Sequence, residues 1–233
     1  MFEKLREQVV AANRALVEAR LVVLTFGNAS AVDRDAGVMA IKPSGVDYSL
    51  LRPVDVPLLD LATGDVVDGT CRPSSDAPTH LVLYRAFAGV GGIVHTHSPF
   101  ATAWAQARRE LPCAGTTHAD HFRGPVPVTR SLSEEEIAGA YEACTGEVIV
   151  EALTARGFGP AEMPAALVAW HGPFAWGTDV AEAVENAIAL EAVAACAFRS
   201  HLLGGSGSLP AALLERHFAR KRGAAAYYGQ PVP

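Results

Sequence analysis

Apolar residues recur at helical spacing near the start of the chain, and charged residues fill the positions between them. This pattern predicts an amphipathic helix over residues 3–19, with one face made by Leu5, Val9, Ala12 and Leu16. Shorter apolar runs follow, separated by turns that contain glycine, proline and aspartate, which is typical of strands. We expect these strands at Leu21–Thr25, Gly37–Ile41 and Pro57–Asp60.

Helices and single strands alternate in the rest of the chain. Ser75 or Asp76 is placed to cap a helix that runs to about Ala88, and Ser133 and Glu136 have the spacing of a capping box. The further expected helices are Ala101–Ala107, one from Ser133, Gly146–Arg156, Asp179–Leu203, and Leu209–Arg222, which Gly223 ends. The further expected strands are Gly91–His97 and Ala165–Trp170.

The order of these elements favours a layered α/β fold. Several connections between strands are too short for crossover helices, so a mixed, partly antiparallel sheet fits better than a doubly wound parallel sheet. The sequence holds no internal repeat, low-complexity tract or long linker. We therefore expect a single domain over residues 1–233.

Composition narrows the functional classes. Half of the residues are hydrophobic and 19% are charged, which excludes disorder, and the net charge of −6 argues against sequence-independent nucleic-acid binding. The N-terminal segment lacks the apolar core of a signal peptide, and no uncharged apolar stretch is long enough to cross a membrane. The four cysteines form no CxxC pair, so we expect reduced thiols in a cytoplasmic protein.

Two histidines two residues apart give the first chemical signal. His95 and His97 lie in an apolar run, and alternate side chains of a strand share a face, so both imidazoles are expected to project together. His171 ends another apolar run and is the natural third ligand, although the sequence alone does not bring it to the pair. Three histidines with an open position are typical of catalytic zinc. The alternative is satisfied core or surface histidines. Asp76 fits a fourth ligand, a group that orients a histidine, or a helix cap.

Three short segments carry small polar residues beside glycine or proline: Gly27–Ser30, Lys42–Gly45 and Arg72–Asp76. Backbone N–H groups in tight turns and at a helix N-terminus suit a phosphate, and serine hydroxyls and one lysine add donors. Each segment taken singly is ordinary turn chemistry. Together, upstream of the histidine pair, they indicate a phosphorylated substrate.

Longer motifs carry a family resemblance from the first predicted helix to Gln230. They are TFGNASAVD, IKPSGVDY, RPSSDAPTHLVLYR, GGIVHTHS, GTTHADHF, TGEVIVE, HGPFAWG and RKRGAAAYYGQ. With these segments the chain resembles the class II aldolase and epimerase family, which includes the L-fuculose- and L-rhamnulose-phosphate aldolases. GTTHAD and AYYGQ resemble its L-ribulose-5-phosphate 4-epimerase branch.

The resemblance implies a three-layer α/β/α domain with a mixed, mostly antiparallel central sheet, and a homotetramer with active sites between neighbouring subunits. It implies zinc held by His95, His97 and His171 with Asp76 close by as a further ligand, and manganese or cobalt as substitutes. No NAD is required. The positions that match substrate contacts, chiefly to the phosphate, are Gly27, Asn28, Ser44, Gly45, Ser74 and Ser75, and Lys42 lies beside them.

The implied reaction is epimerisation of L-ribulose 5-phosphate to D-xylulose 5-phosphate. The C4 position carries no acidic proton, so inversion there implies zinc-assisted retro-aldol cleavage of the C3–C4 bond and its re-formation. Asp120 and Tyr228 match the two acid/base residues, with Tyr228 from the neighbouring chain, and His217 and Arg220 on the last helix are candidates to support that site. The alternatives are an aldolase of the same family acting on another phosphorylated ketose, a dehydratase, and a non-catalytic binding module.

The sequence departs from the family pattern at a few positions beside the motifs. Pro99 and Phe100 replace a polar or basic pair, and His121 replaces an aromatic hydroxyl. Ala169 replaces a histidine and is followed by Trp170. None of these removes a predicted ligand or acid/base group. We expect them to alter the surroundings of the ligands or the pocket wall, and thereby the exact sugar.

Overall fold

The computed structural model describes residues 2–205, 207–222 and 226–227. These residues contain seven strands, eight α-helices and one 3-10 helix. The predicted acid/base residue Tyr228 and the predicted helix stop Gly223 lie outside the described residues. In chain order the elements are α1 (Glu3–Glu18), β1 (Asn28–Asp33), β2 (Val38–Ile41), η1 (Pro53–Asp55), β3 (Leu58–Asp60), β4 (Val66–Asp68), α2 (Ala77–Ala86), β5 (Gly92–His95), α3 (Pro99–Gln106), α4 (Thr116–Ala119), α5 (Glu134–Ala138), α6 (Tyr141–Thr154), β6 (Ala165–Leu167), β7 (Pro173–Gly177), α7 (Val180–Leu202) and α8 (Ala211–Arg222).

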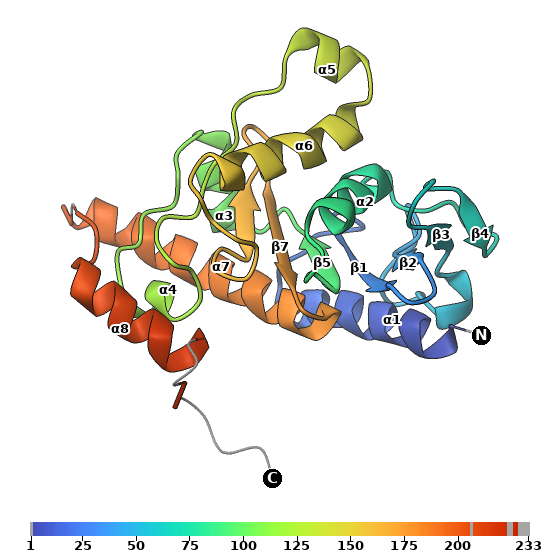
Figure 1. Cartoon of the computed structure of the whole chain (residues 1–233), viewed down its shortest axis with the longest axis horizontal. Coiled ribbons are helices and arrows are strands. Elements are labelled where there is room, and N and C mark those ends of the chain that lie inside the picture. The colour runs from blue at the N-terminus through green and yellow to red at the C-terminus, as the bar shows by residue number, and fades with distance from the viewer. Residues whose placement is uncertain (1, 206, 223–225, 228–233) are drawn as a thin grey trace.

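The strands form one sheet in the order β4-β3-β2-β1-β5-β7-β6. Every pairing between these strands is antiparallel, and an isolated bridge between Val128 and Leu167 is parallel. Helices α1, α3 and α7 cover one face of the sheet, and α2 and α6 cover the other (Figure 1). The predicted three-layer α/β/α fold with a mostly antiparallel sheet is confirmed.

Alternation of side chains along the strands creates two separate cores. In β2, Val38 and Ala40 join the core under α1 and α7, whereas Met39 joins the core under α2 and α6. In β5, Ile93 belongs to the core under α2 and Val94 to the opposite one. His95, the last residue of β5, therefore faces the α2 side, where the cavity described below lies.

Two helices begin where the sequence predicts them, directly after a residue whose side chain caps the backbone. At α5 the Ser133 hydroxyl accepts a hydrogen bond from Glu136 N, and the Glu136 carboxylate accepts one from Ser133 N, which completes the expected capping box. Asp179 accepts a hydrogen bond from Glu182 N and caps α7. The predicted ends of α1, α3, α7 and α8 agree with the structure to within about two residues.

Strand predictions failed where an apolar run is a loop. The expected strand at Leu21–Thr25 is wrong, because these residues are irregular and β1 begins only at Asn28. Leu24 is exposed and has a left-handed φ of 54°, a conformation that does not occur within a regular strand. The pattern also placed the ends of β5 and β6 too late, began α6 too late, and missed β4, β7 and α4.

Two apolar cores and buried hydrogen bonds hold the fold together. All four cysteines are free, with Cys113 buried and Cys196 exposed. Within the described ranges, no helix has both the length and the apolar character that crossing a bilayer requires. Because none of the four cysteines forms a disulfide, the stability of the fold depends on packing between the layers and on the polar groups that join them.

Asn13 joins α1 to the sheet. Its buried Nδ2 donates to Val9 O (2.7 Å), and its Oδ1 accepts a hydrogen bond from Ala29 N in β1 (3.0 Å). Asn13→Leu leaves the Ala29 N–H buried without an acceptor, so we expect the free energy of unfolding to fall by about 2 kcal/mol. Urea unfolding measures this change. Glu7→Ala, at an exposed position of the same helix, is the control, and equal losses in both variants would contradict the role of Asn13.

Two buried histidines outside the predicted metal cluster should make the fold sensitive to acid. Burial lowers the pKa of His80 and of His118 to about 4, whereas histidine in an unfolded chain titrates near about 6.5. The unfolded state therefore binds more protons between these values. We expect the stability to be complete above about pH 6.5 and to fall by about 1.4 kcal/mol per pH unit per histidine as the pH drops toward 4.

Urea unfolding at several pH values measures this slope. His118 Nε2 donates to Gly124 O (2.7 Å), and His118→Asn keeps a donor there but removes the titrating group. The variant should have a shallower slope than the wild type below about pH 6.5. An unchanged slope would show that His118 does not contribute to the acid sensitivity.

Candidate functional site

A cavity of about 440 Å³ lies at one end of the central strands of the sheet, where β1 begins and where β2 and β5 end. The antiparallel register brings these ends together, since Asn28 pairs with His95, and His95 pairs with Phe174 in β7. Every residue predicted to bind phosphate and every predicted metal ligand lines this cavity. The lining residues are Thr25, Phe26, Gly27, Asn28, Lys42, Pro43, Ser44, Gly45, Ser74, Ser75, Asp76, His95, His97, Tyr141, Glu142 and His171.

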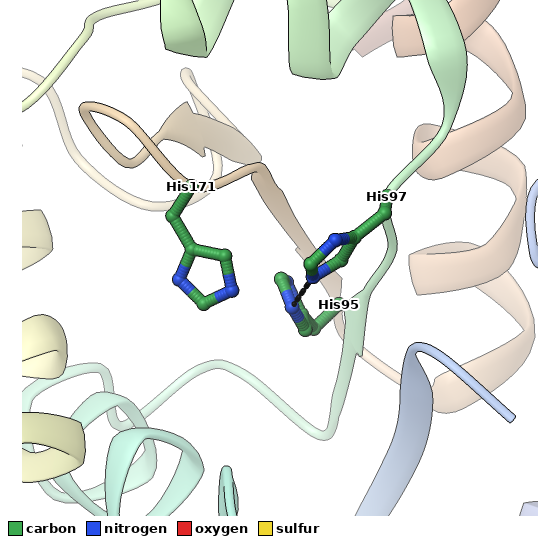
Figure 2. Close-up of side chains that lie close together, drawn as sticks. All are labelled: His95, His97 and His171. Carbon is green, nitrogen blue, oxygen red and sulfur yellow. Dashed lines mark hydrogen bonds between the residues drawn. The ribbon is translucent and has the colours of Figure 1, made fainter.

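Three histidines converge in this cavity from three parts of the chain. His95 is the last residue of β5, His97 lies between β5 and α3, and His171 lies in the turn between β6 and β7. Figure 2 shows the three rings close together, with the dashed line joining two of them. One nitrogen from each ring lies within 4.8 Å of the others, and His95 Nε2 and His97 Nε2 are 3.1 Å apart. The two histidines thus meet although β5 ends before His97.

The electrostatics of the cluster fit a divalent cation. His95 Nδ1 donates to Pro173 O (3.0 Å), so the lone pair of this ring is on Nε2, which faces His97. Burial lowers the pKa of all three histidines, that of His95 to about 3, so the rings are neutral at neutral pH. His171 Nδ1 is buried and has no hydrogen-bond partner among the described residues. Neutral imidazole nitrogens gathered in this way are costly unless they share a cation, and a divalent metal satisfies them.

The turn that carries His171 is held by backbone contacts. Trp170 N donates to Ala105 O at the end of α3 (3.1 Å), and Trp170 has a left-handed φ of 70°, which is uncommon for a bulky residue. Gly172 packs directly on the segment of the other two histidines, because a Cβ there would lie 2.8 Å from Thr96 O. The expected strand therefore ends early, and the turn presents His171 to the end of β5.

Glu191 in α7 fixes the segment that follows His97. Its carboxylate accepts hydrogen bonds from Phe100 N (2.9 Å) and Ala101 N (2.9 Å) in the first turn of α3. An acidic group at this end also complements the helix dipole. The sequence analysis missed Glu191, because a carboxylate 91 residues away along the chain gives no local signal.

Asp76 lies beside the histidines at the start of α2. Its side chain does not cap the helix and instead accepts a hydrogen bond from Asn28 Nδ2 (2.6 Å). Burial raises the pKa of Asp76, but its electrostatic interactions with the neighbouring imidazoles, first His95 and then His80, and the Asn28 hydrogen bond outweigh burial and hold the pKa below its usual value. The carboxylate is therefore ionised next to the cluster, although the cluster of converging ligand atoms contains only the three histidines.

The three predicted anion-binding segments lie side by side in the cavity wall. Ser44 N donates to Arg72 O (2.9 Å), and Ser74 N donates to Lys42 O (3.0 Å), which joins two of the loops. Asn28 Nδ2 donates to Ser74 Oγ (3.0 Å) and ties in the third. These contacts bring together residues that the sequence could only place in separate turns.

Lys42 brings a buried ammonium group to this wall. It is 2% exposed, its Nζ lies 4.7 Å from the centre of the Tyr48 ring, and burial lowers its pKa against the opposing charge of Asp47. The Tyr48 hydroxyl donates to Gly27 O (2.8 Å) and fixes the neighbouring loop. Gly27 has a φ of 84°, and a Cβ on it would lie 2.7 Å from His95 O, so only glycine fits here.

Asp120 lies outside this cavity, at the end of α4 against α8. Arg220 donates from Nε and Nη2 to its two carboxylate oxygens (2.8 and 2.6 Å), and His217 Nδ1 lies 3.0 Å from Oδ1. Burial raises the pKa of Asp120, but the hydrogen bonds from Arg220 and His217 outweigh it and hold the pKa below its usual value. A single chain therefore does not bring this predicted acid/base group to the histidines.

The departures from the family pattern are not among the residues that line the cavity. Phe100 packs against Phe198 in α7 (5.7 Å between ring centres), and the Trp170 indole donates to Ser131 Oγ (3.1 Å). His121 Nε2 lies 2.9 Å from Lys221 Nζ in α8. Pro99 and Ala169 are also absent from the lining residues.

Four lining residues were not singled out in the sequence. Thr25 ends the run mistaken for a strand and Phe26 follows it, and Tyr141 and Glu142 begin α6, which was expected to start at Gly146. No motif marks any of them as a site residue. Only the packing of α6 against α2 brings the start of α6 to the cavity.

Comparisons with known proteins agree with the fold. The model of the family described as Class II Aldolase and Adducin N-terminal domain matches residues 7–198. An L-fuculose 1-phosphate aldolase is 26% identical with a TM-score of 0.79, over 93% of this chain and 95% of that one. YgbL from Klebsiella pneumoniae, described as a candidate aldolase, epimerase or decarboxylase, is 26% identical with a TM-score of 0.71, over 93% and 99%.

A third structure shares the fold. The L-fuculose-1-phosphate aldolase from Thermus thermophilus is 24% identical with a TM-score of 0.69, over 89% of this chain and 100% of that one. The family match spans all the cavity residues and most of α7, but not α8 with His217 and Arg220. The chain belongs to the class II aldolase and adducin N-terminal domain family.

Proposed function

We propose that this protein is a metal-dependent enzyme that epimerises L-ribulose 5-phosphate to D-xylulose 5-phosphate by breaking and re-forming the C3–C4 bond. The observation that carries the proposal is one cavity in which three neutral histidines lie with two joined serine-containing loops and a buried lysine. The histidines fit a divalent cation and the loops fit a phosphate. The GTTHAD and AYYGQ segments favour the epimerase within the family.

Zinc is the metal that we propose, with His95, His97 and His171 as ligands and Asp76 as a further ligand or orienting group. Manganese or cobalt fits the same donors. A divalent metal bound there supplies Lewis acidity, which stabilises negative charge on substrate oxygens during cleavage. The hydrogen bond from His95 Nδ1 to Pro173 O supports this role, because it fixes the ring with Nε2 available.

The loops Lys42–Gly45 and Arg72–Asp76 would bind the phosphate through Ser44, Gly45, Ser74 and Ser75, with the Lys42 ammonium group adding positive charge. Cleavage of the C3–C4 bond yields a phosphorylated aldehyde, which must turn its other face to the enediolate before the bond re-forms. A fixed phosphate keeps this aldehyde in the cavity while the carbonyl rotates.

The two acid/base roles fall to Asp120 and Tyr228 in this proposal. The ionised Asp120 carboxylate would accept the proton of the C4 hydroxyl on one face, and the Tyr228 hydroxyl would return a proton on the other. Because Asp120 lies outside the cavity of its own chain, the proposal requires a neighbouring subunit to supply it. A cytoplasmic homotetramer with active sites between subunits meets this requirement.

A class II aldolase that releases its products is the second candidate. The similarity to L-fuculose 1-phosphate aldolase, at 26% identity over 93% of the chain, favours it. Both activities use the same cleavage step and differ in whether the aldehyde is retained. The distinction therefore depends on product release and not on the metal cluster.

Loss of any one histidine of the cluster should abolish stable zinc binding. His95→Ala, His97→Ala and His171→Ala each leave two imidazoles, and we expect affinity to fall by more than about 100-fold. Metal analysis after dialysis measures the zinc that remains. His201→Ala, on the exposed face of α7, is the control and should keep zinc. Full zinc retention in the three cluster variants would sink the proposed metal site.

The direct test is conversion of L-ribulose 5-phosphate by the purified protein, before chelation, after chelation and after return of zinc. Formation of D-xylulose 5-phosphate that is lost and regained with zinc is the expected result, and Asp120→Asn should lower kcat by about 10²–10⁴-fold. Accumulation of free glycolaldehyde phosphate would instead support the aldolase. Absence of both products with metal-loaded protein would overturn the proposed substrate.

A further inference from the structure

Tyr141 has no role in the reaction outlined above, yet it lines the cavity beside Asp76 and the three histidines. It is the first residue of α6. We propose that Tyr141 is a specificity-determining residue whose hydroxyl donates a hydrogen bond to a sugar hydroxyl of the phosphorylated substrate. This inference rests on the proposed function and adds to it the means by which the unphosphorylated part of the sugar is recognised.

The position of Tyr141 is fixed by the packing of α6 on α2. Thr79 Oγ1 in α2 donates to Glu142 O (2.6 Å), and Thr145 Oγ1 donates to Tyr141 O (2.9 Å). Gly146 lies so close to α2 that a Cβ there would be 2.7 Å from Val82 Cβ. The first turn of α6 is therefore held at a set distance from the start of α2, where Asp76 lies, and a residue held in this way can select among substrates.

The Tyr141 hydroxyl is available for a ligand. The hydroxyls of Tyr48 and Tyr84 bond to protein groups, whereas the Tyr141 hydroxyl makes no hydrogen bond to any described residue. Burial, followed by the charge of Asp76, raises the pKa of Tyr141, so the phenol stays protonated and acts as a donor. A donor on a residue that lines the cavity can bond to an oxygen acceptor of a ligand, which a sugar supplies.

Asn28, which also lines the cavity, carries an acceptor atom without a partner in the described ranges. Its Nδ2 is occupied by Asp76 Oδ2 (2.6 Å) and Ser74 Oγ (3.0 Å), and its Oδ1 is buried without a partner among the described residues. A phosphate dianion offers only acceptors and cannot satisfy Oδ1, whereas a hydroxyl can donate to it. Asn28, Asp76 and Tyr141 line the same cavity, and Asn28 is hydrogen-bonded to Asp76, so this cavity holds both an acceptor and a donor that lack a protein partner within the described part of the chain. This pair is the complement of a sugar hydroxyl.

The test couples Tyr141→Phe to the removal of one hydroxyl from the ligand. Pentitol 5-phosphates carry the hydroxyls and the phosphate but no carbonyl, so they bind without being cleaved. Metal-loaded wild type, Y141F and the control Glu147→Gln, exposed on the same helix, are titrated by calorimetry with the pentitol phosphate, its monodeoxy derivatives and inorganic phosphate.

In the wild type we expect removal of one particular hydroxyl to weaken binding by about ten-fold, the size of one neutral hydrogen bond. Y141F should bind the parent pentitol phosphate about ten-fold more weakly, and removal of that same hydroxyl should then cost less than about two-fold. Inorganic phosphate should bind both proteins alike, and Glu147→Gln should match the wild type. These results together support the inference.

Other outcomes separate the two proposals. If the wild type converts L-ribulose 5-phosphate and Y141F binds every pentitol phosphate as the wild type does, only the role of Tyr141 is overturned. The role of Tyr141 is also overturned if, for every monodeoxy derivative, the loss of binding caused by Y141F and the loss caused by removing the hydroxyl are additive. Additive losses show that Tyr141 contacts none of these hydroxyls. A wild type that neither binds a pentitol phosphate nor converts any phosphorylated ketose overturns the proposed function and this inference together.

Discussion

The centre of this molecule depends on one constraint: three neutral imidazoles face one another at the end of a central strand of the sheet, although only His95 is fully buried. The antiparallel register meets part of it by setting His95 between Asn28 and Phe174 on neighbouring strands. The remaining histidines lie outside regular strands, so other contacts must hold them. A carboxylate cap on α3 and a short hairpin turn do this. The cluster is therefore a product of the whole fold and not of one motif.

The cavity is chemically divided. One side gathers histidines and an ionised carboxylate, and the other gathers serine hydroxyls, backbone N–H groups and a buried ammonium group. Such a division orients a bifunctional ligand, because a phosphate and a pair of metal-chelating oxygens prefer opposite ends. The described chain keeps Asp120 away from both sides and bound to α8. The proposed use of Asp120 as a proton acceptor at the cavity therefore requires a second subunit.

Sequence patterns predicted the layers and most of the cavity because both depend on local signals. The two-residue spacing of His95 and His97 indicated a shared site, although a loop and not a strand face brings them together. Glycine- and serine-containing turns indicated an anion-binding site, and their hydrogen bonds to one another join them in the structure. The pattern could not locate Glu191 or Tyr141, because their positions arise from contacts between distant elements. It also mistook the exposed apolar run before Gly27 for a strand, since hydrophobicity alone does not reveal pairing.

Gly27 and Gly172 press on the histidine segment from two sides, with no space for even a methyl group at either position. The floor of the cavity therefore tolerates few substitutions, because a side chain at either glycine must displace the segment that carries His95 and His97. Its rim is built differently, from a loop at Thr25–Phe26 and from the first turn of α6. New sugar preferences in such a scaffold can arise by exchanging rim side chains while the floor is inherited unchanged. The same architecture that holds the histidine segment in place leaves the side chains at the rim of the cavity free to change.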